Sequence, residues 1–226
     1  MNHSLEVDSI ILEFGNKRIL QDIYIHSETG IITGIIGKNG TGKTCLMRII
    51  YGELDITNKS IRLNGETLLN GVQNLDAFHY LPQFNFIPKN RRTKSIFKDF
   101  SNDFSEFLEY FPEFKKYYHF KIGRLSEGEK RIIEIYNIIK AKSKFCMLDE
   151  PFSQVMPVHV ETIKEIIVQE KRNKGMIITD HLYEHILNVS DRLYLLHKGK
   201  THLVNSVHDL EVFGYVSEND NKHKNQ

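Results

Sequence analysis

The chain has 226 residues, of which 40% are hydrophobic and 26% charged, with a formal net charge of +1 at pH 7. This length suits one domain, or one domain with an added lobe, and the hydrophobic fraction suffices for a core. The near-neutral charge does not support a general nucleic-acid surface, so we expect no nucleic-acid partner. The first residues lack the segments of a signal peptide, and no apolar run reaches the ~18 residues that predict a membrane span.

Residues 4–36 are rich in predicted strands and lead into a phosphate-binding motif. The runs 10–14 and 19–25 predict strands around a turn at Gly15-Asn16. After the apolar run 31–36, the pattern G-x-x-x-x-G-K-[ST] is matched in full by Gly37-Lys38-Asn39-Gly40-Thr41-Gly42-Lys43-Thr44. Residues 45–51 predict a helix, and Gly52 is a suitable residue for its end.

Each part of this loop has its own task in holding a nucleotide. Glycines let the backbone wrap closely, so that several N–H groups point at one phosphate. Lys43 would bring a positive charge to the β- and γ-phosphates, and the Thr44 hydroxyl would bind Mg²⁺. The following helix presents its positive end to the same anion. The alternative is a glycine-rich turn without a ligand, but the preceding strand and the following helix favour nucleotide binding.

The middle of the chain contains a predicted hairpin and strand, followed by a region rich in aromatic residues. Residues 61–63 with Asn64-Gly65 predict a hairpin, and a strand is predicted over 78–81. Residues 84–120 hold 12 of the chain's 24 aromatic residues (10 Tyr plus 14 Phe). Five phenylalanines recur at helical spacing before Pro112, namely Phe97, Phe100, Phe104, Phe107 and Phe111. We interpret them as the apolar face of a helical lobe; the alternative is that part of this surface docks a partner.

From residue 125 onward, predicted helices and strands alternate. The helices cover 127–141 and 158–173, and the strands cover 144–148 and 176–179. This order indicates a parallel sheet. Residues 192–204 predict a closing hairpin, and the polar tail 217–226 is expected to be disordered. We therefore expect one domain over residues 4–216, with the helical lobe at about 84–142.

A second nucleotide motif ends the strand over 144–148. The run Phe145-Cys146-Met147-Leu148-Asp149-Glu150 is an apolar strand that ends in two carboxylates. Near a phosphate loop, Asp149 would hold Mg²⁺ through water, and Glu150 would orient or deprotonate the attacking water. A buried strand that ends in two acids by chance is the less favoured alternative. Both cysteines, Cys45 and Cys146, lie inside nucleotide motifs, so we expect no disulfide and a reducing cytosol.

The run Leu125-Ser126-Glu127-Gly128-Glu129 lies between the two nucleotide motifs. Ser126 and Glu129 satisfy the S-x-x-E capping box, which predicts a helix start. A capped helix start is also a second place that can bind an anion. The structural and the functional interpretation are compatible.

Together, these motifs resemble those of the ATPase subunit of an ATP-binding-cassette (ABC) transporter, over about residues 10–204. Residues 125–129 resemble the family signature Leu-Ser-Gly-Gly-Gln, which is specific to this family. The resemblance implies an α/β fold, a P-loop NTPase of the ABC type with a mostly parallel core sheet, an antiparallel β subdomain and a small helical lobe. It also implies ATP and Mg²⁺ as cofactors and an ATPase activity coupled to transport.

The resemblance further implies roles for single residues. Phe14 lies where the family stacks an aromatic ring on adenine, and residues 37–45 would bind the phosphates. The implied catalytic residues are Glu150, the switch histidine His181 and the loop glutamine Gln83. The implied metal ligands are Thr44, Gln83 and Asp149. Three signature residues would close over ATP bound to a partner subunit, namely Ser126, Gly128 and Glu129.

Several of these residues also have ordinary structural explanations when each is taken alone. Phe14 could belong to the core, Gln83 could be an ordinary loop residue, and His181 could follow the helix cap Asp180. The joint order and spacing of the motifs carry the inference.

The chain departs from the family pattern at several positions. Glu127 and Glu129 replace Gly and Gln in the signature, and we expect Glu129 to cap its helix and Glu127 to point away from the nucleotide. Cys45 offers only a weak S–H donor where the family has a hydroxyl. The family's Asp that crosses the dimer interface is absent, and Met156 stands near its place, so the communication between the two sites and the rate of hydrolysis stay open. The order Asp180-His181 resembles a subgroup that includes lipopolysaccharide-export and branched-chain amino-acid ATPases, without identifying a substrate.

Three functions stay open from the sequence. The first is a motor subunit that forms a head-to-tail dimer, expected to be a homodimer, and docks an integral membrane subunit at the Gln83 loop and the helical lobe. It would lie on the cytoplasmic face of the inner or plasma membrane, with Phe84, Phe86 and Ile87 lining the docking groove. The second is a soluble ABC ATPase acting on ribosomes or DNA, which the single domain without a coiled-coil insertion disfavours. The third is a slow-turnover, nucleotide-dependent regulatory module.

Overall fold

The computed structural model describes residues 2–68, 77–181 and 183–216. The strands are β1 (Ser4–Asp8), β2 (Leu12–Phe14), β3 (Lys17–Leu20), β4 (Tyr24–Glu28), β5 (Ile32–Ile36), β6 (Ser60–Leu63), β7 (Glu66–Thr67), β8 (Phe78–Leu81), β9 (Phe145–Asp149), β10 (Gly175–Asp180), β11 (Arg192–His197) and β12 (Lys200–Val204). The helices are α1 (Lys43–Tyr51), α2 (Thr93–Asp99), α3 (Phe104–Tyr110), α4 (Glu127–Lys140), α5 (Pro157–Glu170), α6 (Tyr183–Leu187) and α7 (Val207–Val212), with the 3₁₀ turns η2 (Pro112–Tyr117) and η3 (Ile122–Arg124). The tail predicted over 217–226 lies outside the described residues.

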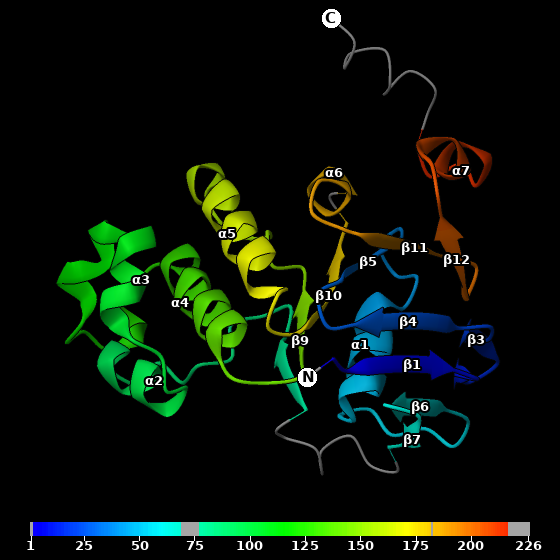
Figure 1. Ribbon diagram of the computed structural model, residues 1–226, viewed down its shortest axis with the longest axis horizontal. Helices are drawn as coiled ribbons and strands as arrows, with labels where there is room; N and C mark the ends of the chain where they lie inside the picture. The colour runs from blue at the N-terminus through cyan, green and yellow to red at the C-terminus, as the bar shows by residue number, and fades with distance from the viewer. Residues whose placement is uncertain (1, 69–76, 182, 217–226) are drawn as a thin grey trace, which may run out of the picture.

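A six-stranded sheet in the order β12-β11-β5-β10-β9-β8 forms the centre of the molecule (Figure 1). Its strands from β11 to β8 are parallel, and β12 pairs antiparallel with β11. A four-stranded antiparallel sheet, β4-β1-β6-β7, and the hairpin β2-β3 make up a separate β region. The α/β fold expected from the sequence is confirmed, with a mostly parallel core sheet and an antiparallel β subdomain.

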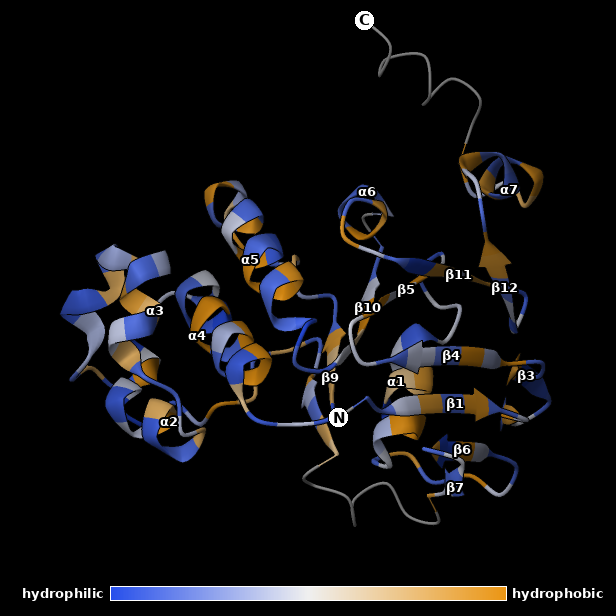
Figure 2. Ribbon diagram, in the orientation of Figure 1, coloured by the Kyte–Doolittle hydropathy of each residue, from blue (hydrophilic) through white to orange (hydrophobic). Residues whose placement is uncertain are grey.

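The central sheet separates two hydrophobic cores. All residues of β5, β9 and β10 are buried, because other elements cover both faces of the sheet. Successive residues of β9 enter different cores, as the two-residue period of a strand requires. Cys146 and Leu148 pack with α4 and α5, whereas Phe145 and Met147 pack with α1 and the antiparallel sheet. Figure 2 shows hydrophobic segments on the central strands and mixed hydropathy on the outer helices.

The helical lobe lies at the end of the molecule opposite the antiparallel sheet (Figure 1). Its phenylalanines follow helical spacing across two short helices, α2 and α3, and not along one helix. Ser101 has a positive φ of 57°, and the Asp103 side chain accepts a hydrogen bond from the Ser105 N–H, so the chain turns between the helices. The Phe107 ring is fully buried and contacts the rings of Phe97, Phe104, Phe111, Phe114 and Tyr136. These residues therefore form the core of the lobe.

The prediction of a single strand over residues 19–25 was wrong. The structure divides this segment between β3 and β4, with a break at Gln21 and Asp22. Both of these residues donate their backbone N–H to the Gly199 carbonyl, at 2.9 and 3.4 Å. The turn between β11 and β12, which is distant in sequence, therefore binds this segment and interrupts the strand. Among the described residues, no helix is both long and apolar enough to cross a membrane.

Replacement of Phe107 by Ala should lower the free energy of unfolding by about 3–5 kcal/mol, because it empties the centre of the lobe's aromatic core. Urea unfolding followed by far-UV circular dichroism measures this change. Phe84→Ala is the matched control, since that side chain is 71% exposed, and it should change the free energy by less than about 0.5 kcal/mol. Equal effects of the two substitutions would contradict the assigned core.

Candidate functional site

The phosphate-binding loop connects β5 to α1 and closes on itself. Gly40 and Gly42 have positive φ angles of 78° and 105°, which side-chain-bearing residues rarely adopt. The Lys43 ammonium donates hydrogen bonds to the carbonyls of Gly37 at 2.7 Å and Lys38 at 3.4 Å. The Thr41 hydroxyl also donates to the Lys38 carbonyl, at 2.8 Å. The loop thus holds its lysine ready beside the position where an anion would bind.

The Lys43 side chain is buried and stands opposite several carboxylates. Burial lowers the pKa of Lys43, and the negative charges of Glu150, Asp149 and Asp180 oppose this shift. The two effects have opposite signs because burial disfavours the charged form, whereas nearby anions favour it.

Asp149 ends β9 at the edge of the sheet where the phosphate loop begins. Its carboxylate is fully buried and accepts hydrogen bonds from the hydroxyls of Thr179 at 2.5 Å and Tyr80 at 3.2 Å, and also from Thr44. Burial raises the pKa of Asp149, and these hydrogen bonds lower it. A threonine hydroxyl next to a carboxylate fits Mg²⁺, which prefers oxygen ligands and retains several waters.

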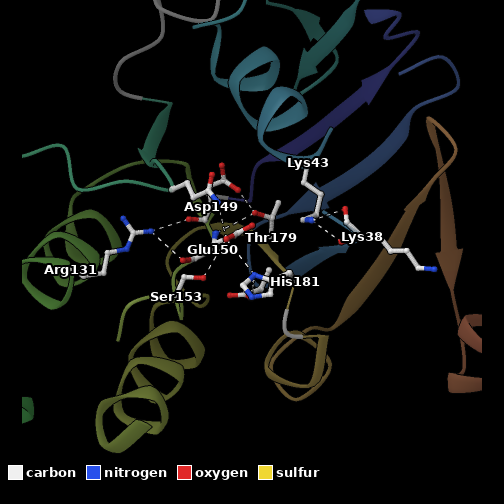
Figure 3. A network of polar contacts seen from close by, with 11 residues as sticks. Lys38, Lys43, Arg131, Asp149, Glu150, Ser153, Thr179 and His181 are labelled. Carbon is white, nitrogen blue, oxygen red and sulfur yellow. Dashed lines mark hydrogen bonds and ion pairs between the residues drawn. The ribbon is translucent and has the colours of Figure 1, made fainter. Parts of the chain in front are cut away.

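Glu150 lies where the ends of β8, β9 and β10 converge (Figure 3). Its Oε2 accepts hydrogen bonds from Gln83 Nε2 at 2.9 Å and from the Ser153 hydroxyl at 3.3 Å. The Nδ1 atom of His181 lies 3.4 Å from the same oxygen and 3.5 Å from Asp180 Oδ1. Parallel strands place their carboxyl ends at one edge of the sheet, which explains why residues so distant in sequence meet here. Two of the residues expected to be catalytic, Gln83 and His181, therefore both lie against the carboxylate of the third, Glu150.

A cavity of about 390 Å³ opens in front of this edge. Its lining includes most of the residues that sequence analysis associated with the nucleotide: Phe14, Asn39, Gly40, Gly42, Lys43, Thr44, Cys45, Gln83 and Glu150, together with Ile19. The Phe14 ring is 57% exposed, so it does not belong to the core. Cys45 is partly buried, and burial raises the pKa of its thiol.

The signature segment begins α4 and does not line this cavity. The predicted capping box is present: the Ser126 hydroxyl accepts from the Glu129 N–H, and Glu129 accepts from the Ser126 N–H. The Glu127 carboxylate contacts Lys130 at 2.5 Å and Asn85 at 2.7 Å. The structure therefore places Ser126, Gly128 and Glu129 apart from the residues that surround the phosphate loop in the same chain.

Sequence analysis missed two charged residues of α4 that support the site. Arg131 is fully buried and donates to the carbonyl of Pro82 at 2.7 Å, of Asp149 at 3.0 Å and of Glu150 at 3.3 Å (Figure 3). One oxygen of Glu134 accepts the N–H groups of Phe86 and Ile87, each at 2.9 Å. Both charges interrupt the apolar face of the predicted helix, and this interruption was the signal that could have identified them.

The segment that follows the acidic pair carries exposed apolar side chains. Met156 is 62% exposed, and Val158 in the first turn of α5 is 69% exposed. The Met156 side chain makes no capping hydrogen bond to α5. Exposed apolar side chains, one of them a flexible methionine, therefore lie on the surface after the acidic pair.

Comparison with known proteins relates this geometry to a family. The model of the ABC transporter family matches residues 20–153. The chain is 27% identical to the high-affinity branched-chain amino acid transport ATP-binding protein of Pseudomonas aeruginosa, covering 87% of this chain and 90% of that protein. It is 28% identical to the lipopolysaccharide export system ATP-binding protein of Haemophilus influenzae, covering 87% and 88%.

Among solved structures, an ATP-binding subunit of an ABC transporter has the same fold, with a TM-score of 0.79, 19% identity and 94% of each chain covered. The family match covers more than half of the chain and contains both the phosphate loop and the acidic pair. This chain therefore belongs to the ABC transporter family, as one of its ATP-binding subunits with ATPase chemistry.

Proposed function

We propose that this subunit energises a membrane transporter through ATP-driven head-to-tail dimerisation, with a second copy as its partner. The observation that carries this proposal is the separation of the two nucleotide-binding surfaces. The phosphate loop surrounds the cavity of about 390 Å³, whereas the signature residues 125–129 lie outside its lining. Each surface is half of a site, and two copies in opposite orientation complete two sites.

In the proposed site, the Phe14 ring stacks on adenine and the backbone of residues 37–45 holds the phosphates. Lys43 would exchange its contacts with the loop carbonyls for the β- and γ-phosphates. Thr44 and Asp149, with Gln83, would hold Mg²⁺, which neutralises phosphate charge when bound. Cys45 faces the same cavity and leaves the backbone N–H groups as the main donors near the α-phosphate.

Glu150 is the proposed general base. Its Oε2 would orient the attacking water and accept a proton from it, while Gln83 and Ser153 fix the carboxylate by their hydrogen bonds. His181 lies against the same carboxylate and would contact the γ-phosphate from the end of β10. Arg131 holds the backbone of Glu150 in place through the carbonyls of both acidic residues.

The proposed docking site for an integral membrane subunit lies beside the Gln83 loop. A groove of about 470 Å³ is lined there by Phe86, Ile87, Pro88, Arg91, Ile96, Asp99 and Phe100. Phe84 and Phe86, next to Gln83, are 71% and 40% exposed. The two hydrogen bonds from this loop to Glu134 connect the groove with α4 and the signature. The subunit would accordingly lie on the cytoplasmic face of the inner or plasma membrane.

A second candidate function is a nucleotide-dependent regulatory module with slow turnover. The exposed Met156 favours it, because the family has an Asp there that crosses the dimer interface. Turnover measured with and without the membrane subunit distinguishes the two functions: a motor hydrolyses ATP faster when it is coupled to its transporter, and a regulatory module does not.

Glu150→Gln should lower ATP turnover by about 10²–10⁴-fold, because an amide cannot accept the proton of water. The same variant should accumulate as an ATP-bound dimer, which size-exclusion chromatography with light scattering detects. Glu165→Gln, at an exposed position of α5, is the control and should leave both properties unchanged. Absence of an ATP-dependent dimer at high protein concentration would argue against the head-to-tail mechanism.

Alkylation of Cys45 tests where the nucleotide binds. Because burial raises the pKa of this thiol, its reaction with iodoacetamide should be slow at pH 7 and accelerate as the pH rises towards the raised pKa. ATP should protect it, since the thiol lines the cavity. Cys146 is fully buried with a pKa of about 12 and serves as the internal control that stays unlabelled in the folded protein. Mass spectrometry reads both sites, and equal Cys45 labelling with and without ATP would contradict the proposed phosphate site.

A further inference from the structure

Three donors converge on the carboxylate of Glu129 in the signature. Its Oε1 accepts the Tyr117 hydroxyl at 2.5 Å, and its Oε2 accepts both the N–H and the hydroxyl of Ser126, each at 2.8 Å. The hydroxyl of Ser126 in turn accepts the Glu129 N–H at 3.3 Å. The carboxylate is thereby turned back over the start of α4.

The Tyr117 phenol reaches this carboxylate from the end of η2 in the helical lobe. Its ring makes edge contacts with Phe114 and Phe120, with centroids 5.6 Å apart in each case. The Lys116 ammonium lies 4.8 Å from the centre of the Tyr117 ring, and its charge also favours the ionised form of Glu129. Tyr117 itself packs against the main hydrophobic core. Thus the aromatic core of the lobe determines where this hydroxyl lies.

The other acidic residue of the signature is neutralised differently. Glu127 is held by the Lys130 ammonium and the Asn85 amide, both close in space to the start of α4. Neither of these groups contacts Glu129. Tyr117 is therefore the group that connects the lobe's aromatic core to the carboxylate of Glu129.

We propose that Tyr117 is a positioning residue of the signature, which holds the Glu129 carboxylate away from the ATP of the partner subunit. The inference rests on the proposed head-to-tail dimer, in which Ser126 and Gly128 close over a γ-phosphate. A carboxylate at Glu129 released from these donors would face that phosphate and repel it. Through Tyr117, movement of η2 relative to the start of α4 changes how well the signature accepts ATP.

A double-mutant cycle in the Glu150→Gln background tests this inference, with the dissociation constant of the ATP-bound dimer measured by analytical ultracentrifugation. Tyr117→Phe keeps the ring contacts and removes only the hydroxyl, so it should weaken the dimer about fivefold or more. Glu129→Gln added to Tyr117→Phe should restore the dimer to within about twofold, because an amide does not repel phosphate. The defect of Tyr117→Phe should also shrink in about 1 M salt, which screens charge repulsion.

Two further measurements separate this effect from a loss of structure. Tyr118→Phe is the matched control, since the neighbouring Tyr118 ring packs on Phe104 and His119, and it should leave the dimer unchanged. Binding of a fluorescent ATP analogue to the monomer should be the same in all variants, because Tyr117 does not line the phosphate-loop cavity.

The outcomes distinguish this inference from the proposed function. If the Glu150→Gln parent forms no ATP-dependent dimer, the head-to-tail mechanism is overturned and this inference with it. If the parent forms the dimer but Tyr117→Phe leaves its affinity unchanged, only the inference on Tyr117 is overturned. A weakened dimer that Glu129→Gln does not restore also overturns it, because the effect would then not pass through the carboxylate.

Discussion

The buried guanidinium of Arg131 is the interaction on which the arrangement of the site depends. It joins the end of β8, through the carbonyl of Pro82, to the end of β9, through the carbonyls of Asp149 and Glu150. Burial lowers the pKa of Arg131, and the carboxylate of Glu134 provides the strongest opposing attraction. A fully buried charge needs acceptors for its donors. Three of the acceptors here are main-chain carbonyls of the site itself, whereas Arg131 Nε has no hydrogen-bond partner among the described residues. Loss of this side chain would leave those carbonyls without their donor.

Helix α4 links three functional regions because its charges point in different directions. Its first turn carries the signature, Arg131 reaches the acidic pair, and Glu134 accepts the backbone of the loop after Gln83. A displacement of the helical lobe would therefore act on the proposed general base and on the signature together. In the proposed transporter, these hydrogen bonds of 2.9 to 3.3 Å would form a physical path for coupling between a docked membrane subunit and ATP hydrolysis.

The chain departs from the family pattern at acidic and at apolar residues. The acidic residues gain hydrogen-bond partners nearby, whereas the exposed apolar side chain of Met156 does not. Within the same chain, Glu127 accepts from the Lys130 ammonium and the Asn85 amide, and Glu129 accepts from the Tyr117 hydroxyl. Met156 gains no comparable partner and is exposed, so the surface after the acidic pair is more apolar than a family Asp would make it. At this position, the proposed dimer would thus depend on apolar contacts and not on a hydrogen bond to a charged group.

Elements and motifs that depend on neighbouring residues could be predicted from the sequence. The phosphate loop, the capping box of Ser126 and Glu129, and the Asn64-Gly65 hairpin all rest on glycines or hydrogen bonds within a few residues. The alternation of strand and helix after residue 125 likewise predicted the parallel sheet. The family signature predicted the fold class and the grouping of Gln83, Glu150 and His181.

The remaining features depend on contacts between distant segments. The division of residues 19–25 into two strands arises from the Gly199 carbonyl, and the connection of Tyr117 to Glu129 requires the folded aromatic core of the lobe. No local pattern specifies such contacts, because their partners meet only after the chain has folded. By itself, the sequence determined which groups can bind a nucleotide. The tertiary structure alone decided how buried Arg131 and Glu134 hold those groups together and how the charges of the signature are neutralised, since burial and long-range hydrogen bonds exist only in the packed chain.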